Sequence, residues 1–239
     1  MIYVKLAENH FTLYNHYNYI EKLYEDYFSD IPGTKIRVSE QDLLRENRDN
    51  GNWPEEYLES LAFYRKICEY LLDRDILLFH CSAIEMDGKA YLFTAPSGTG
   101  KSTHVRLWKE YFGDKVTVIN DDKPLLSVKD EGIRVYGTPY GGKHGLQTNI
   151  SAPVAAIVIL QQNSGNQAEK LRGKDAYPIL LNQTYRRNDP AGIIRTMDLV
   201  NRLAELPIYL LRCNISTEAV QMIYEKLTEI DENERKTYR

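Results

Sequence analysis

Residues 95–103 read Ala-Pro-Ser-Gly-Thr-Gly-Lys-Ser-Thr and follow the apolar run 90–93. A glycine-rich turn between a strand and a helix directs several backbone N–H groups into one concavity, and the positive end of the helix dipole adds to that field. The stretch therefore predicts a phosphate-binding loop in an α/β fold. The residues expected to contact a nucleotide are Pro96, Ser97, Gly98, Thr99, Gly100, Lys101, Ser102 and Thr103.

Two side chains at the end of this loop have expected roles. Lys101 is placed to reach the β- and γ-phosphates, and the Ser102 hydroxyl to ligate the Mg²⁺ that bridges them. Ala95 stands where such loops usually have their first glycine, and it fits if its backbone keeps a negative φ. A glycine-rich turn that binds nothing is the alternative reading.

Composition narrows the class of protein. The 239 residues are 43% apolar and carry a net charge of −4, which fits a globular protein and argues against a dedicated nucleic-acid binder. No apolar run approaches the roughly 20 residues of a membrane span, so no membrane partner is expected. Residues 1–6 lack a signal-peptide layout, and the three cysteines lack zinc spacing. Reduced thiols in the cytoplasm are the expectation.

The chain before the loop is expected to form a small α+β region over residues 1–74. Residues 75–231 are expected to form the domain that carries the loop, and 232–239 a charged tail. The expected elements of the first part are a strand at 1–6, a helix at 17–28, a strand at 35–38, an exposed loop at 41–53 and a helix at 55–73.

In the second part, a strand at 76–84 contains His80, and a turn at 87–88 makes a hairpin with the next strand. The other expected elements are a helix at 101–112, strands at 116–120, 125–128, 133–136, 155–160 and 208–213, a polar segment at 163–175, a helical segment at 175–206 broken at Pro178 and Pro190, and a helix at 217–230.

A pair of carboxylates follows the strand at 116–120. Asp121 and Asp122 come about twenty residues after Lys101. Because ligands of α/β sheets bind at the carboxyl ends of strands, these side chains are expected to face the glycine-rich loop. Two adjacent carboxylates can divide the work of holding Mg²⁺ and accepting a proton. A solvated turn is the alternative for this pair.

With these residues in place, the chain resembles a known family. His80 lies fifteen residues before Ala95, and that spacing, with 95–103 and then Asn120-Asp121-Asp122, resembles the catalytic domain of HPr kinase/phosphorylase. The larger superfamily includes the ATP-dependent phosphoenolpyruvate carboxykinases. The resemblance covers roughly residues 75–160. It implies a P-loop kinase core of that type, with a mixed sheet flanked by helices.

The resemblance also implies roles. Asp122 is the catalytic base, supported by His80 and Lys101, with Ser102 and Asp121 at the metal and with ATP and Mg²⁺ as cofactors. The glutamate that completes the metal site in HPr kinases has no counterpart here, and the segment that grips HPr is not recognisable. The chain is most similar to the short HPr kinase-like proteins of bacteria. Assembly of HPr kinases as hexamers makes a homo-oligomer an expectation.

The glycine-rich segment from residue 137 onward places cations and amides near this site. Lys143, His144 and Asn149 are candidates for holding the acceptor, with an exposed, solvated hairpin as the alternative. For His104, in the helix after the loop, packing and nucleotide contact are both open. Three arginines are expected on a solvated basic face: Arg186, Arg187 and Arg195.

The expected function is therefore an ATP- and Mg²⁺-dependent kinase that transfers the γ-phosphoryl group to a hydroxyl, with a serine of a peptide or small protein as acceptor. A small-metabolite kinase is one alternative. A nucleotide-binding regulatory module with slow hydrolysis is another. No base-reading motif decides between ATP and GTP.

Overall fold

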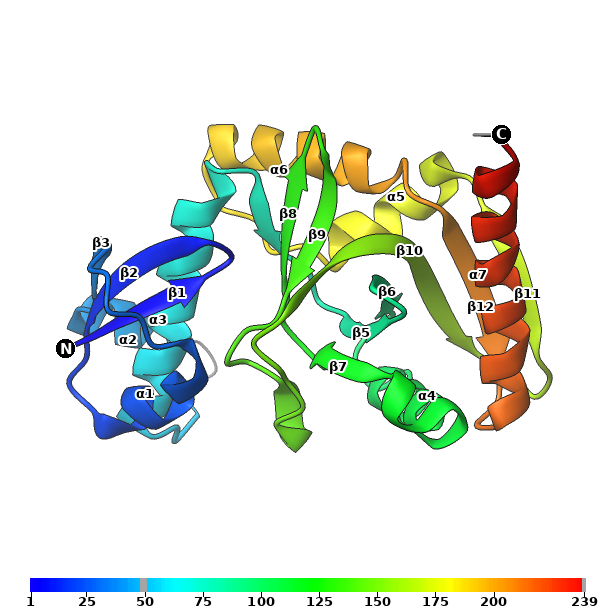
Figure 1. Cartoon of the computed structure of the whole chain (residues 1–239). Coiled ribbons are helices and arrows are strands. Elements are labelled where there is room, and N and C mark those ends of the chain that lie inside the picture. The colour runs from blue at the N-terminus through cyan, green and yellow to red at the C-terminus, as the bar shows by residue number, and fades with distance from the viewer. Residues whose placement is uncertain (48–50, 238–239) are drawn as a thin grey trace. The chain divides into compact units, whose positions relative to one another are not determined.

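The computed structural model describes residues 1–47 and 51–237, with side chains described up to residue 228. The chain folds into two compact units, Met1–Leu77 and Leu78–Arg239 (Figure 1). No helix in the described part of the chain is long and apolar enough to cross a membrane.

The first unit combines a three-stranded sheet with helices. β2 pairs antiparallel with β1 and parallel with β3, and Ala7 and Glu8 make the β1–β2 turn at positive φ. The helix expected at 17–28 is shorter, because α1 ends at Leu23 and a 3₁₀ turn follows. The elements are β1 (Ile2–Leu6), β2 (Asn9–Tyr14), α1 (Asn18–Leu23), η1 (Glu25–Tyr27), β3 (Thr34–Arg37), α2 (Glu40–Glu46) and α3 (Glu55–Leu72).

The prediction of a loop at 41–53 is wrong for its first part, which forms α2. Residues 48–50 of that segment lie outside the described residues. A capping box starts α2: the Ser39 hydroxyl accepts from the backbone N–H of Asp42, and the Asp42 carboxylate accepts from the backbone N–H of Ser39. The two bonds satisfy donors that a helix start leaves unpaired. The pattern Ser-x-x-Asp was the signal in the sequence.

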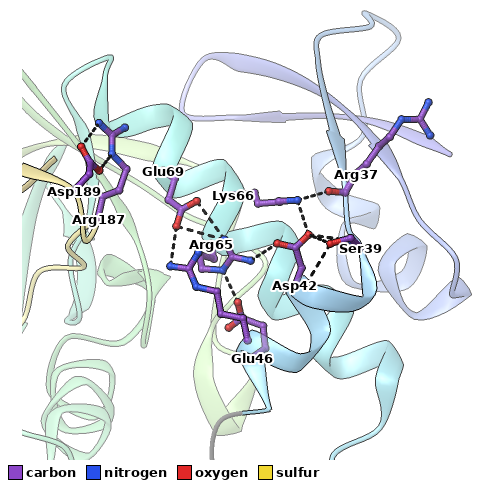
Figure 2. A network of polar contacts seen from close by, with 10 residues as sticks. Arg37, Ser39, Asp42, Glu46, Arg65, Lys66, Glu69, Arg187 and Asp189 are labelled. Carbon is purple, nitrogen blue, oxygen red and sulfur yellow. Dashed lines mark hydrogen bonds and ion pairs between the residues drawn. The ribbon is translucent and has the colours of Figure 1, made fainter. Parts of the chain in front are cut away.

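Arg65, on α3, is the centre of a polar network (Figure 2). Its buried guanidinium contacts Asp42 at 2.7 Å, Glu46 at 2.5 Å and Glu69 at 3.2 Å. Lys66 adds a second cation on Asp42, at 2.6 Å. The network joins α2 to α3, so the short helix α2 is held by charge as well as by its cap.

The pKa of the Asp42 carboxyl shows the effect of this network. Burial alone would raise that pKa, but hydrogen bonds from Lys66, the Ser39 backbone and Arg65 hold it well below its usual range. A carboxyl whose pKa is depressed by folding stabilises the fold above its unfolded pKa, about 3.9. That stability is lost as the pH falls from there through the folded pKa.

We expect Arg65→Leu to lower the free energy of unfolding of the first unit by about 3 kcal/mol at pH 7, because three carboxylates lose their shared cation. The wild-type unit should lose stability below about pH 4, and the variant should lose less. Urea unfolding followed by circular dichroism at pH 7 and pH 3 measures both effects. Lys22→Leu, which removes an exposed cation of α1, is the control. Equal unfolding free energies for both variants would contradict this account.

The second unit is a mixed α/β structure in which a curled mixed sheet is flanked by helices (Figure 1). The strands run in the order β8-β9-β10-β6-β5-β7, and β12 pairs with β10 and β11. The strands are β5 (Ser82–Met86), β6 (Lys89–Thr94), β7 (Thr117–Asn120), β8 (Leu125–Lys129), β9 (Gly132–Tyr136), β10 (Ser151–Gln162), β11 (Gln167–Leu171) and β12 (Ile208–Cys213). The helices are α4 (Lys101–Phe112), α5 (Gly173–Asn182), α6 (Pro190–Leu203) and α7 (Thr217–Thr237), with short 3₁₀ turns at Gly113–Lys115 (η2) and Gly142–His144 (η3).

Several boundaries differ from the sequence expectation. The strand expected at 76–84 is two strands, β4 (Ile76–Leu78) and β5, and His80 lies between them. The polar segment at 163–175 contains the edge strand β11, which pairs with β12. Pro178 lies inside α5 and Pro190 begins α6. The helix expected to end at 230 continues to Thr237, so most of the expected tail is helical, and residues 238–239 lie outside the described residues.

One face of the large sheet packs on α4 and α7. Side chains that alternate along β6 and β10 point to this face, and they meet Trp108 of α4 and Ile223 of α7 in one buried cluster. Alternation is the consequence of the strand period of two. Figure 1 shows α5 and α6 on the opposite side of the sheet from α4. The sheet is thus covered on both faces, which leaves its strand ends as the place for a site.

Candidate active site

Four strands of the second unit end at one edge of the sheet. β6 and β12 both run parallel to β10, and β7 has the direction of β6 because β5 pairs antiparallel with each of them. Their carboxyl ends therefore meet, and in α/β sheets this is the edge where ligands bind. The segments that leave this edge begin with Ala95, Asp121, Asn163 and Asn214.

The glycine-rich loop has the local geometry that its sequence predicts. It connects β6 to α4, and Gly98 and Gly100 have φ of +82° and +110°, a region where a side chain is strained. Within the loop, the Thr99 hydroxyl donates to the Pro96 carbonyl at 2.8 Å. Gly100 is the N-cap of α4, so the first amides of that helix have no partner within the helix and point toward the loop.

Ala95 has the negative φ that an alanine needs at the first position of the loop. It is fully buried, and the described non-glycine residues with positive φ are Ala7, Glu8, Asp75 and Asp87. Ala95 thus keeps an ordinary backbone conformation, and its methyl group packs in the core shared with α4.

Lys101 begins α4 and lies largely buried under the loop. Its ammonium group donates to the Ala95 carbonyl at 3.0 Å. Burial lowers the pKa of Lys101, and the nearby carboxylates of Asp122 and Asp121 oppose that shift. The structure therefore brings together the lysine and the carboxylate pair that the sequence placed twenty residues apart.

The side chain of Asn120 fixes the backbone of the carboxylate pair. Its amide oxygen accepts from the backbone N–H groups of Asp122 at 2.9 Å and Lys123 at 2.8 Å, and its amide nitrogen donates to Thr138. Asp121 is buried, and its carboxylate accepts from the Ser82 hydroxyl at 2.5 Å. The two carboxylates thus have different surroundings. Asp121 is buried and hydrogen-bonded to a hydroxyl, whereas Asp122 is partly exposed.

Asp122 is paired with His80. The His80 Nε2 atom lies 3.2 Å from Asp122 Oδ1, and Lys123 Nζ lies 3.8 Å from Oδ2. Burial would raise the pKa of Asp122, but the His80 hydrogen bond and the positive charges of Lys123 and Lys101 hold it below its usual value. The carboxylate is therefore ionised at neutral pH and can accept a hydrogen bond from a hydroxyl.

The glycine-rich segment after β9 lies against Asp122. A Cβ atom on Gly142 would come within 3.1 Å of the Asp122 Cβ, so only glycine, at its φ of +73°, fits there comfortably. Lys123 N–H donates to the Tyr140 carbonyl. Lys143 and His144 follow in an exposed 3₁₀ turn, and Asn149 is also exposed, a few residues further along. This segment thus borders the carboxylate, with the side chains of Lys143 and His144 exposed to solvent.

A cavity of about 680 Å³ lies beside the loop, and sequence reasoning missed it. The ends of β10 and β12 form one side of it and the first turns of α4 the other. Gln162 links the two sides by donating to the Thr99 carbonyl at 3.2 Å. The strand-end rule, applied to the buried strands ending at 160 and 213, was the available signal. The lining includes Thr99, Thr103, Leu107, Leu160, Asn163, Asn214 and Ile215.

His104 is a packing residue. It is buried, its Nε2 accepts from the Trp108 indole N–H at 3.0 Å, and Phe93 meets its ring edge-on. Burial lowers the pKa of His104 to about 4, so the ring is neutral near pH 7. Of the two roles that the sequence left open, packing is therefore observed, and the imidazole also lines the wall of the cavity.

All three arginines considered as a basic face interact with other groups of the chain. Arg187 pairs with Asp189, the N-cap of α6, and Arg186 donates to the Leu181 carbonyl.

Comparisons with known proteins give a structural similarity and no match by sequence. No family model matches the chain, and no curated protein matches it. Among solved structures, the Hpr(Ser) kinase/phosphatase from Coxiella burnetii matches with 13% sequence identity and a TM-score of 0.36, over 67% of this chain and 93% of that chain. The similarity is distant. At this identity and score the match assigns no function, and the functional argument depends on the geometry of the site itself.

The coarser part of the fold expectation is confirmed, namely a mixed sheet flanked by helices. The donors at the site also fit Mg²⁺. Proteins hold this ion with one or two carboxylates, and phosphate oxygens and water complete its shell. Asp121 is a buried carboxylate that forms no ion pair in the described part of the chain, and it has only a hydroxyl donor on its side chain. In residues 1–47 and 51–228, no three or more His, Cys, Asp or Glu side chains group together as metal ligands. Mg²⁺ does not need such a group, because it binds through one or two carboxylates.

Proposed function

We propose that the chain is an ATP- and Mg²⁺-dependent kinase that transfers the γ-phosphoryl group to the hydroxyl of a serine in a peptide or small protein. The observation that carries the proposal is the arrangement of three side chains at the strand ends. An ionised Asp122, bound to His80, lies close enough to the buried Lys101 for their charges to interact, beside a loop of glycines and free helix amides. Phosphoryl transfer requires positioned phosphates, a cation and a proton acceptor.

Each group has a task in the transfer. The loop amides and the Lys101 ammonium bind the β- and γ-phosphates and stabilise the negative charge that develops on the transferred group. The acceptor oxygen forms a bond to the γ-phosphorus while the bond from that phosphorus to the β–γ bridging oxygen breaks, and ADP leaves with the electron pair. Asp122 takes the hydroxyl proton. Ser102 and Asp121 are the residues that would hold Mg²⁺, which neutralises phosphate charge when bound.

The cavity beside the loop supports a nucleoside as the other half of the donor. Its volume lies in the range of small-molecule sites, and its lining includes Gly98, Thr99 and Gly100, where the phosphates would begin. Leu107, Leu160 and Ile215 supply apolar surface for a base, and Gln162, Asn163 and Asn214 supply amides. The carboxylate pair and the cavity thus lie on different flanks of one loop, as a donor and an acceptor require.

A labelling experiment tests the proposal. The protein is incubated with γ-³²P-ATP, Mg²⁺ and fractions of a cell extract, and labelled species are separated and hydrolysed for phosphoamino-acid analysis. Phosphoserine in a peptide or protein is the expected product, and the Asp122→Asn protein should form it far more slowly. Label in a small metabolite would correct the acceptor class. Release of inorganic phosphate at the same rate with and without extract, with no labelled product, would favour a regulatory module instead.

The nucleoside cavity gives a separate prediction for binding. Ile215 is exposed in the free protein, so Ile215→Ala should leave folding intact and remove apolar surface that a base would cover. At about 25 cal/mol per Å² of lost apolar contact, we expect roughly a 3- to 10-fold weaker affinity for ATP. Affinity for inorganic tripolyphosphate, which has no base, should stay unchanged. Calorimetric titration with both ligands measures this, and equal weakening of both would place the nucleoside elsewhere.

A further inference from the structure

Residues 183–185 lie directly beside residues 78–80. The backbone N–H of His80 donates to the Gln183 carbonyl at 2.7 Å, and the N–H of Tyr185 donates to the Leu78 carbonyl at 3.0 Å. Phe79 and Thr184 form the bridge between these bonds. Gln183 is also the C-cap of α5, with its own N–H bonded to carbonyls of the last turn. The backbone of this residue is thus fixed from two sides, independently of its side chain.

The side chain of Gln183 contacts the ring of His80. The amide Oε1 atom lies 2.8 Å from His80 Nδ1, while the other ring nitrogen, Nε2, lies 3.2 Å from Asp122 Oδ1. The His80 carbonyl accepts from the Thr94 hydroxyl at 3.0 Å. Every polar group of His80 therefore has a partner, and Gln183 supplies two of the four.

The chemistry of the ring explains why an amide is useful at this position. An ionised carboxylate only accepts hydrogen bonds, so the nitrogen that faces Asp122 must carry a proton. In a neutral ring Nδ1 is then an acceptor, and in a cationic ring it is a donor. An amide can serve both by a half-turn about its last torsion, which has a broad two-fold preference. A carboxylate would bind only the cationic ring, and an apolar side chain would bind neither.

We propose that Gln183 is a positioning residue of this site: its side-chain amide holds the ring of His80 in the orientation in which Nε2–H faces Asp122. The inference rests on the proposed kinase, in which Asp122 receives the acceptor proton. Through His80, Gln183 holds the carboxylate in the direction needed to meet that proton. The residue lies 103 positions away from His80 in the chain, and nothing local in the sequence marks it.

Three variants separate positioning from simple space-filling. Gln183→Met keeps the volume and loses the hydrogen bond, whereas Gln183→Glu keeps an acceptor for Nδ1–H and adds a charge. If Gln183 positions His80, the Met variant should have a kcat about 10- to 100-fold lower with an unchanged KM for ATP, because loss of the partner of a functional histidine has an effect of this size in other proteins. The Glu variant should retain most of the wild-type kcat. A space-filling role predicts that both variants keep kcat, because methionine and glutamate both have about the volume of glutamine. Asn182→Met, on an exposed neighbour, controls for an added thioether.

A second measurement does not need activity. In protein labelled with ¹⁵N-histidine, the two ring nitrogens report which of them carries the proton, and His80→Gln assigns the signals. We expect a protonated Nε2 in the wild-type and Gln183→Glu proteins, and a mixture of tautomers in Gln183→Met. A wild-type ring with a bare Nε2, or identical spectra for wild type and Gln183→Met, would overturn the inference. If these spectra behave as expected while the labelling experiment finds no transfer, the kinase fails and the positioning role stands.

Discussion

Asp122→Asn is expected to lower the rate of phosphoryl transfer by about 10²- to 10⁴-fold, the usual contribution of a positioned general base. Asparagine has the same shape, and the bond from Asn120 is to the backbone of residue 122, so the chain should keep its path. The amide cannot take up the acceptor proton. Affinity for Mg²⁺·ATP should remain within about threefold, because the phosphates are bound by the loop and by Lys101.

Single-turnover quench experiments with γ-³²P-ATP and the labelled acceptor fraction measure the transfer rate, and calorimetry measures nucleotide affinity. The matched control is Asp114→Asn, at an exposed position in the 3₁₀ turn after α4. It should behave as wild type in both assays. Transfer at an undiminished rate in Asp122→Asn would remove this residue as the base, and the buried Asp121 would be the next carboxylate to test.

Lys101→Met is expected to lower kcat/KM for ATP by about 10²- to 10³-fold, as removal of one charge-stabilising donor does in other active sites. The ammonium group bonds the Ala95 carbonyl in the free protein, so it is already inside the loop, where phosphate oxygens would be its alternative partners. Methionine fills similar space without a charge. The fold should therefore persist.

Thermal unfolding with and without Mg²⁺·ATP gives a readout that needs no acceptor. Binding to the native state raises the melting temperature, so the wild type should show a ligand-induced rise and Lys101→Met little or none. Lys109→Met, exposed in the last turn of the same helix, should keep the full rise. An unchanged rise in Lys101→Met would argue against phosphate binding by this loop.

The parts of the site that the sequence predicted are those encoded over a few residues. The glycines at 98 and 100, the lysine that begins α4 and the carboxylates at the end of β7 are local patterns with a direct structural meaning. The hairpin of β5 and β6 also follows from its Asp-Gly turn and is confirmed. Such patterns work because turn conformation and helix start depend on the residues themselves.

The parts that were missed depend on distant pairing. His80 was expected within a strand, but the bonds from residues 183–185 hold it between two strands. The polar segment that forms β11 is a strand because β12 offers it an edge, and nothing in its own composition shows this. The cavity needs the ends of β10 and β12 beside α4. Each of these features requires the tertiary arrangement first.

β10 has a further consequence, for the order in which the second unit can fold. This long strand pairs with β9 by its first residues, then with β6, and with β12 by its last residues. Its pairing with β6 must close a loop containing α4, β7, β8 and β9, and its pairing with β12 encloses α5 and α6. Loop closure of this kind is slow, because chain entropy is lost before the contacts form. A chain in which β10 has not yet paired lacks one wall of the cavity. Because this pairing is slow, nucleotide binding should appear only in the last phase of refolding.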